Sequence, residues 1–131
     1  MSDPSLIREK LIQIKEALQR VDRRFTPIKA PNDFLTSDSG TDMLDAIGMM
    51  LIAISENLKK IDYKTNGELL KRYPSVNWRG AIGMRNILSH YYFDLDANKV
   101  FNICQTNIPE LAAVIQTMID DIDFSPGEAA V

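Results

Sequence analysis

Residues 84–92, Met-Arg-Asn-Ile-Leu-Ser-His-Tyr-Tyr, carry the side chains of this chain that are best suited to chemistry. They include the single histidine of the sequence, His90, with Arg85 five residues before it. Arginine offers a planar fork of donors that matches phosphate oxygens, and histidine exchanges a proton near neutral pH. This segment therefore predicts a site that binds phosphate and moves protons.

Helical geometry gathers the polar members of this segment on one arc. At about 100° per residue, the apolar side chains fall on the opposite arc. A solvated helix face is normally rich in Lys, Glu and Gln, and this polar arc has none of them. It consists of Arg85, Asn86, Ser89, His90 and Tyr92.

Three of these residues, His90, Arg85 and Tyr92, also have a structural interpretation that stays open at this point. A lone histidine on a helix is more often a hydrogen-bonded or surface residue than a catalyst. Arg85 could form an ion pair between helices with Glu56 or Asp94, and Tyr92 could be a solvated residue at the rim of the bundle.

Composition bounds the class of protein. With 131 residues, 45% hydrophobic and 25% charged, the sequence predicts a single soluble globular domain. One cysteine and one histidine exclude an intramolecular disulfide and make a zinc site within one chain unexpected, so no cofactor is predicted. The longest apolar run, residues 47–54, is too short to span a membrane, and the N-terminus lacks the pattern of a signal peptide. A cytoplasmic location is expected.

The net charge of −3 argues against a protein that coats nucleic acid along its whole surface. It leaves room for a local basic groove, since four basic residues lie just before or within the 84–92 segment. The alternative, that they are separate solvated side chains, stays open. The four residues are Lys71, Arg72, Arg79 and Arg85.

The spacing of apolar residues predicts an all-α protein. Apolar residues recur every three or four positions from Ile7 to Phe25, in a helix that Ser2 or Asp3-Pro4 should open and Pro27 should end. A similar seam in a second helix, from about residue 41 to 61, indicates that the two helices pack as an antiparallel pair. Further helices are expected at residues 78–92 with Asn77 as N-cap, at 97–106 after Asp96, and from Pro109 to about 122, with a short piece at 68–72. Residues 26–40 should form a loop with a short turn at 33–35. The expected architecture is an up-and-down bundle of about five helices.

Some features of this bundle have two explanations. Met43 and Met50 widen the apolar seam of the second helix, which favours core packing over a subunit interface. Gly80 and Gly83 in the early turns of the 78–92 helix permit close approach of another backbone or of a ligand, and close packing of another helix is favoured. Residues 1–124 are expected to form a single helical domain, and residues 125–131 a disordered tail.

The extended motif resembles the HEPN superfamily, and more narrowly the HepT-like toxins of prokaryotic toxin–antitoxin pairs. The resemblance lies in Arg85-x-x-x-x-His90-x-Tyr92, with Asn86 after the arginine, and in the stretch from Tyr73-Pro74 through Asn77-Trp78 and Gly83 to Phe93-Asp94. Ile54-Ser55-Glu56 in the second helix also fits, although the family often has glycine where Ser55 stands. The resemblance covers roughly residues 5–122.

The resemblance implies a HEPN-like, homodimeric, metal-independent endoribonuclease. Arg85 would then bind the scissile phosphate, His90 would transfer the proton, and Asn86 would position or polarise the same groups. Tyr92 matches the tyrosine that a minimal nucleotidyltransferase antitoxin, of the MntA type, modifies with AMP. Contacts to the RNA substrate are expected from Arg79, Ser89, Lys71 and Arg72.

Two rival functions belong to other classes. The chain could be a non-catalytic substrate-binding or nucleotide-binding companion subunit of a minimal nucleotidyltransferase, or a plain helical dimerisation protein. The presence of Arg85, Asn86, His90 and Tyr92 together favours a nuclease, because a scaffold has no need of all four.

Overall fold

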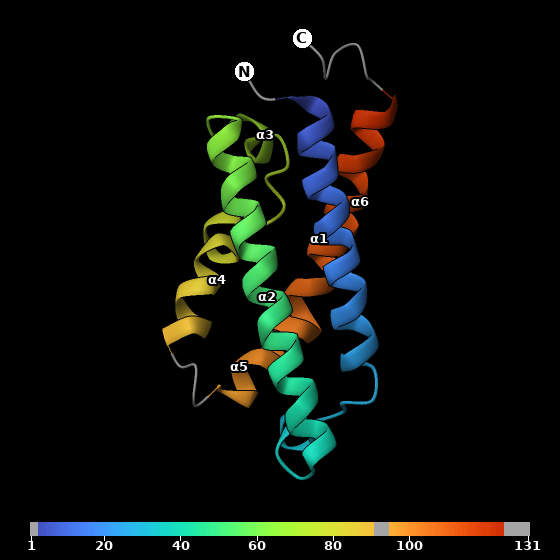
Figure 1. Ribbon diagram of the computed structural model, residues 1–131, viewed down its shortest axis with the longest axis vertical. Coiled ribbons are helices and arrows are strands. Elements are labelled where there is room, and N and C mark those ends of the chain that lie inside the picture. Colours follow the sequence, from blue (N-terminus) through green and yellow to red (C-terminus); the bar gives the residue numbers. More distant parts are fainter. Residues whose placement is uncertain (1–2, 91–94, 125–131) are drawn as a thin grey trace.

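The computed structural model describes residues 3–90 and 95–124, and gives Ile87, Ser89 and His90 as helix positions only. Four longer helices run alternately up and down, with α4, α2, α1 and α6 side by side in that order (Figure 1). The expected all-α, up-and-down bundle is confirmed for this part of the chain. The elements are α1 Pro4–Phe25, η1 Pro31–Phe34, α2 Asp38–Lys64, α3 Glu68–Lys71, α4 Trp78–His90, α5 Ala97–Asn102, η2 Ile103–Asn107 and α6 Ile108–Phe124.

Helix α1 follows the sequence prediction closely. The Asp3 carboxylate caps its start by accepting the backbone N–H of Ser5 at 2.9 Å, and Pro4 occupies the first turn, where its missing N–H is not needed. The apolar seam is buried along its length and faces both α2 and α6. Its members are Ile7, Leu11, Ile14, Leu18 and Val21.

Helix α2 begins at Asp38, three residues before the predicted start. Ser37 is its N-cap, because the Ser37 hydroxyl accepts the N–H of Gly40 at 2.9 Å. Gly40 lies in the first turn of α2, where a Cβ would stand 2.2 Å from the carbonyl oxygen of Asp33 in η1. Only glycine fits this close approach. Ser39 and Gly40, which are residue types typical of loops, are therefore compatible with the first turn of α2. The short turn expected at 33–35 is η1, which starts two residues earlier.

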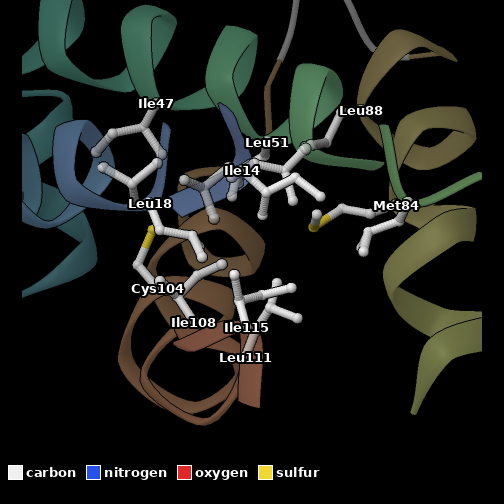
Figure 2. Packing of buried hydrophobic residues seen from close by; sticks show 14 of the residues in the cluster. Ile14, Leu18, Ile47, Leu51, Met84, Leu88, Cys104, Ile108, Leu111 and Ile115 are labelled. Atoms are coloured by element: carbon white, nitrogen blue, oxygen red, sulfur yellow. The ribbon is translucent and has the colours of Figure 1, made fainter. Parts of the chain in front are cut away.

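The core lies where α1, α2, α4 and α6 converge, and Figure 2 shows their side chains pointing toward one another. Met43 and Met50 of α2 pack partly buried against this core, which confirms the core interpretation, while Met49 is 56% exposed. Burial of Met84 and Leu88 attaches α4 to the bundle. The residues labelled in that view are Ile14, Leu18, Ile47, Leu51, Met84, Leu88, Cys104, Ile108, Leu111 and Ile115.

Helices α5, η2 and α6 follow one another along the chain without an intervening loop. Asp96 caps α5 as predicted, since its carboxylate accepts the N–H groups of Asn98 and Lys99. The expected break before Pro109 is a π-helical stretch, η2, and not a loop. Proline lacks an N–H and its ring collides with the preceding turn of a regular α-helix, and a local widening of the helix relieves both problems.

The two ends of the described chain lie side by side (Figure 1). Arg8 of α1 holds Asp123 of α6 through two hydrogen bonds, from Nε at 2.7 Å and from Nη2 at 3.1 Å. The tail predicted at 125–131 lies outside the described residues. None of the helices that the structure describes is long and apolar enough to cross a membrane.

Candidate functional site on helix α4

The start of α4 is fixed by three hydrogen bonds. The Asn77 side-chain oxygen accepts the N–H of Gly80 at 3.0 Å, which confirms the predicted N-cap. The indole N–H of Trp78 donates to the carbonyl oxygen of Tyr73 at 2.8 Å. The Tyr73 hydroxyl in turn donates to a carboxylate oxygen of Asp121 in α6 at 2.5 Å. The segment that leads into α4 is thus tied to the far side of the bundle.

The same contacts change the proton affinity of Tyr73. Partial burial, together with the hydrogen bond to the Asp121 carboxylate, raises the pKa of the Tyr73 hydroxyl from 10 to about 12. Tyr73 is therefore a neutral hydrogen-bond donor over the whole physiological range.

Helix α4 is amphipathic in the predicted sense. Met84 and Leu88 are buried with exposed fractions of 6% and 3%, while Arg79, Arg85 and Asn86 are exposed. Along the helix, Arg85 lies on the flank next to α2, and Arg79 and Asn86 lie on the outer flank. The arginine and amide of the predicted site are therefore open to a molecule that approaches from solvent.

Arg85 also makes the ion pair that the sequence suggested as its structural alternative. Its Nε–H donates to Oε1 of Glu56 in α2 at 2.9 Å, and both side chains are about half exposed, at 47% and 43%. The other suggested partner, Asp94, lies outside the described residues. The contact leaves the terminal nitrogens of the guanidinium without a hydrogen bond to Glu56.

Among the described residues of this chain, neither glycine of α4 makes the predicted close contact with another helix. A Cβ on Gly80 would meet the Asn77 side chain at 2.9 Å, so this position makes room for the N-cap and not for another helix. A Cβ on Gly83 would meet nothing within 4 Å in the part of the chain that the structure describes. Gly83 therefore faces open space, on the same outer flank of α4 as Arg79 and Asn86.

The remaining predicted site residues are placed only in part. Ser89 and His90 occupy the last two positions of α4, and Tyr92 lies outside the described residues. Lys71 ends α3 and Arg72 is its C-cap, and both are exposed. Within residues 3–90 and 95–124, Lys71, Arg72 and Arg79 make no ion pair.

Arg85 is about half exposed, and it does not line the hollow beside α4. The hollow beside α4 has a volume of about 230 Å³ and is mainly apolar, with Ala81 and Met84 on one wall and Ile108 and Leu111 on the other. Small ligands bind in such concave sites, whereas an exposed arginine on a helix suits a polymeric phosphate ligand.

The fold and the motif on α4 define a small helical bundle of the HEPN type. The sequence matches the family Ribonuclease HepT-like over residues 14–118, and the chain belongs to this family. No solved structure matches it.

Curated relatives from Methanocaldococcus jannaschii share 26–31% of the aligned residues. "Gamma-glutamylcyclotransferase and putative RNase MJ0434" is 26% identical over 113 residues, which cover 86% of this chain and 47% of the relative. "Putative RNase MJ1216" is 31% identical over 78 residues, covering 60% of this chain and 61% of the relative. "Putative RNase MJ1380" is 29% identical over 51 residues, covering 39% and 47%. The chain thus spans about half to three-fifths of the length of these relatives.

Proposed function

We propose that this chain is a metal-independent endoribonuclease, acting as the toxin of a type VII-like toxin–antitoxin pair. The observation that carries the proposal is Arg85, held exposed on α4 inside the segment that matches the ribonuclease family. The names of the relatives agree with RNA as the substrate. The proposed catalytic unit is the helical domain of residues 1–124.

The proposed reaction needs no metal. The ribose 2′-oxygen attacks the adjacent phosphorus, the bond from phosphorus to the 5′-oxygen breaks, and a 2′,3′-cyclic phosphate and a 5′-hydroxyl result. A base takes the proton of the 2′-hydroxyl, and an acid gives a proton to the leaving oxygen. In this proposal Arg85 stabilises the charge of the pentacoordinate phosphorus, Asn86 orients the phosphate, and His90 transfers the protons.

The single histidine gives a reason for a homodimer. One chain supplies one imidazole, and a site that uses one histidine as base and another as acid requires His90 from two subunits. Mixed dimers with one wild-type and one His90→Ala subunit should then lose far more than half of the activity. Retention of half would contradict a shared site.

The proposed antitoxin is a minimal nucleotidyltransferase of the MntA type that transfers AMP to Tyr92. Tyr92 follows Arg85 by seven residues, which is about two helical turns. An AMP group there adds a negative charge and bulk near the arginine proposed to bind RNA, so it competes with the substrate phosphate. AMP-labelled protein is expected to bind and cleave RNA at least about tenfold more weakly than unlabelled protein.

The other basic residues are proposed to contact RNA phosphates without reading sequence. Alanine at Lys71, Arg72 or Arg79 should weaken RNA binding. The slope of the logarithm of the binding constant against the logarithm of the salt concentration should become shallower by about 0.7 for each phosphate that is no longer bound, which is the value for single strands. The same changes should leave cleavage at saturating RNA nearly intact. Ser89 is proposed as a further hydrogen-bond donor to the backbone.

The test is RNA cleavage by the purified chain in EDTA. Arg85→Ala and His90→Ala should each reduce cleavage by at least about 100-fold, as expected for loss of a group that acts in the transition state. The matched control is Arg20→Ala, which removes an exposed arginine from α1 and should cleave like the wild type. If the wild type, folded and dimeric, does not cleave, the non-catalytic companion subunit of a nucleotidyltransferase replaces the nuclease as the proposal.

A further inference from the structure

Among the residues that the structure describes, two arginines bind carboxylates across helices, and they do so differently. Arg8 uses Nε and Nη2 together on Asp123, which occupies the side of its guanidinium. Arg85 uses Nε alone on Glu56, at 2.9 Å. The contact with Glu56 thus orients the guanidinium of Arg85, while its two terminal nitrogens make no hydrogen bond within the part of the chain that the structure describes.

The ion pair contributes little to holding the fold together. Both side chains are about half exposed, and water screens the attraction between such charges. The attachment of α4 to α2 comes from the buried side chains of Met84 and Leu88 on α4, which join the same core as Leu51 on α2. The function of Glu56 is therefore to be sought at Arg85 and not in stability.

The geometry suits a phosphate ligand. A guanidinium is planar, and its two terminal nitrogens form a fork that can donate to two phosphate oxygens at once. An arginine side chain has several rotatable bonds, so an arginine without a partner spends much of its time pointing elsewhere. A carboxylate on Nε restrains the plane of the group and leaves this fork free.

Glu56 is itself placed by a rigid part of the molecule. It lies in the interior of α2, one residue after Ser55, whose side chain is buried at 1% exposure and donates to the carbonyl oxygen of Ile52 at 2.9 Å. Helix α2 packs on both α1 and α4. The carboxylate therefore starts from a backbone position that the core fixes.

We propose that Glu56 is the positioning residue of Arg85: it holds the guanidinium through Nε so that the terminal nitrogens meet the scissile phosphate. The proposal deepens the nuclease function above and rests on it. Glu56 does not touch the substrate, and it acts only through Arg85. A carboxylate that instead blocked Arg85 would have the opposite effect on activity.

The experiment compares Glu56→Ala and Glu56→Asp with wild type and with Glu68→Ala, which removes an exposed carboxylate from α3. Glu56→Ala should lower kcat by about 10- to 100-fold, the range for a misplaced catalytic group, with a smaller change in KM. Glu56→Asp keeps the charge and should recover part of the activity. Glu68→Ala and the melting temperatures of all variants should stay at wild-type values.

A double-mutant cycle shows whether the effect passes through Arg85. In an Arg85→Ala background, Glu56→Ala should lower activity by no more than about twofold, because the group it positions is gone. A full further reduction in that background overturns the proposal, and so does wild-type or raised activity of Glu56→Ala alone.

A spectroscopic readout separates this proposal from the nuclease function. The Nε–H resonance of Arg85, assigned by its disappearance in Arg85→Ala, should be sharp in wild type and broadened by exchange with water in Glu56→Ala. A wild type that fails to cleave RNA overturns both the nuclease function and the catalytic role of Glu56. A wild type that cleaves RNA, with an Nε–H signal unchanged in Glu56→Ala, overturns only the positioning.

Discussion

The hydrogen bond from Tyr73 to Asp121 gives a sharp prediction of stability. Tyr73→Phe removes the hydroxyl and keeps the ring, and Asp121 is exposed, so water replaces the missing donor. A hydrogen bond to a charged group contributes about 1.5–3 kcal/mol to the free energy of unfolding. Because this contact is only partly shielded from water, we expect a loss of about 1–1.5 kcal/mol at neutral pH.

The pH dependence of this contribution follows from the raised pKa of Tyr73. The folded state binds the hydroxyl proton more tightly, with a pKa of about 12 against 10 for an ordinary tyrosine, so the stabilisation is complete below pH 10. It is lost as the pH rises from 10 through 12. Two pKa units correspond to about 2.7 kcal/mol without solvent screening, and partial exposure reduces this to the 1–1.5 kcal/mol expected from the hydrogen bond.

The assay is urea unfolding at pH 8 and pH 11.5. With a slope of about 1.5–2 kcal/mol per molar urea, the midpoint of Tyr73→Phe should lie about 0.5–1 M below wild type at pH 8. The gap should shrink to less than half at pH 11.5, where wild type has lost most of the contribution. Tyr63→Phe is the control, because Tyr63 is 85% exposed and should unfold like wild type at both values. Equal midpoints at pH 8, or a gap that is the same at both pH values, would refute the reasoning.

Three further predictions concern the glycines, the core and the cysteine. Gly40→Ala should lower the free energy of unfolding by about 1–3 kcal/mol, because its Cβ would collide with the carbonyl of Asp33. Gly83→Ala, with open space at its Cβ, should raise the free energy of unfolding by up to about 1 kcal/mol. Thermal melting measures both, and a Gly40→Ala variant as stable as wild type would contradict the close approach. Leu51→Ala should cost about 2–5 kcal/mol and Leu51→Met less than about 1.5, since Leu51 has no exposed surface; equal melting of the two would argue against a packed core. Burial raises the pKa of the Cys104 thiol to about 12. Iodoacetamide at pH 8 should therefore label the native chain at least about 100-fold more slowly than the urea-unfolded chain. Rapid labelling of the native protein would contradict the burial.

The long helices could be predicted from the sequence because the spacing of their apolar residues along the chain determines which side chains pack in the core. The seams of α1 and α2 repeat every three or four residues, and each of their central members is buried. The start of α2 was predicted too late because Ser39 and Gly40 look like loop residues. The carbonyl of Asp33 approaches so closely that only glycine fits at position 40, and no local pattern reveals this contact.

The candidate site was predictable to the extent that it lies on one helix. Periodicity alone predicted the exposed Arg85 and Asn86 and the buried Met84 and Leu88, and Glu56 was already one of two suggested partners. The hydrogen bond from Tyr73 to Asp121 was not predicted, because the two residues are 48 positions apart and no local sequence feature of either one indicates the other as its partner. The roles of His90 and Tyr92 stay predictions.

The pairing of the first helix with the last one has a consequence for how the protein emerges from the ribosome. The seam of α1 completes its burial against the end of the chain, including Ile108, Leu111 and Ile115 of α6, which are made about 90 residues after it. At about 5–20 residues per second, α1 and α2 wait several seconds or longer with an apolar face exposed. By then α4 and its arginine have already been synthesised, so the nascent chain carries the elements of the site before the core can close. Mutations that weaken α6 should therefore reduce the yield of folded protein during synthesis more strongly than equally destabilising changes in the α2–α4 contact.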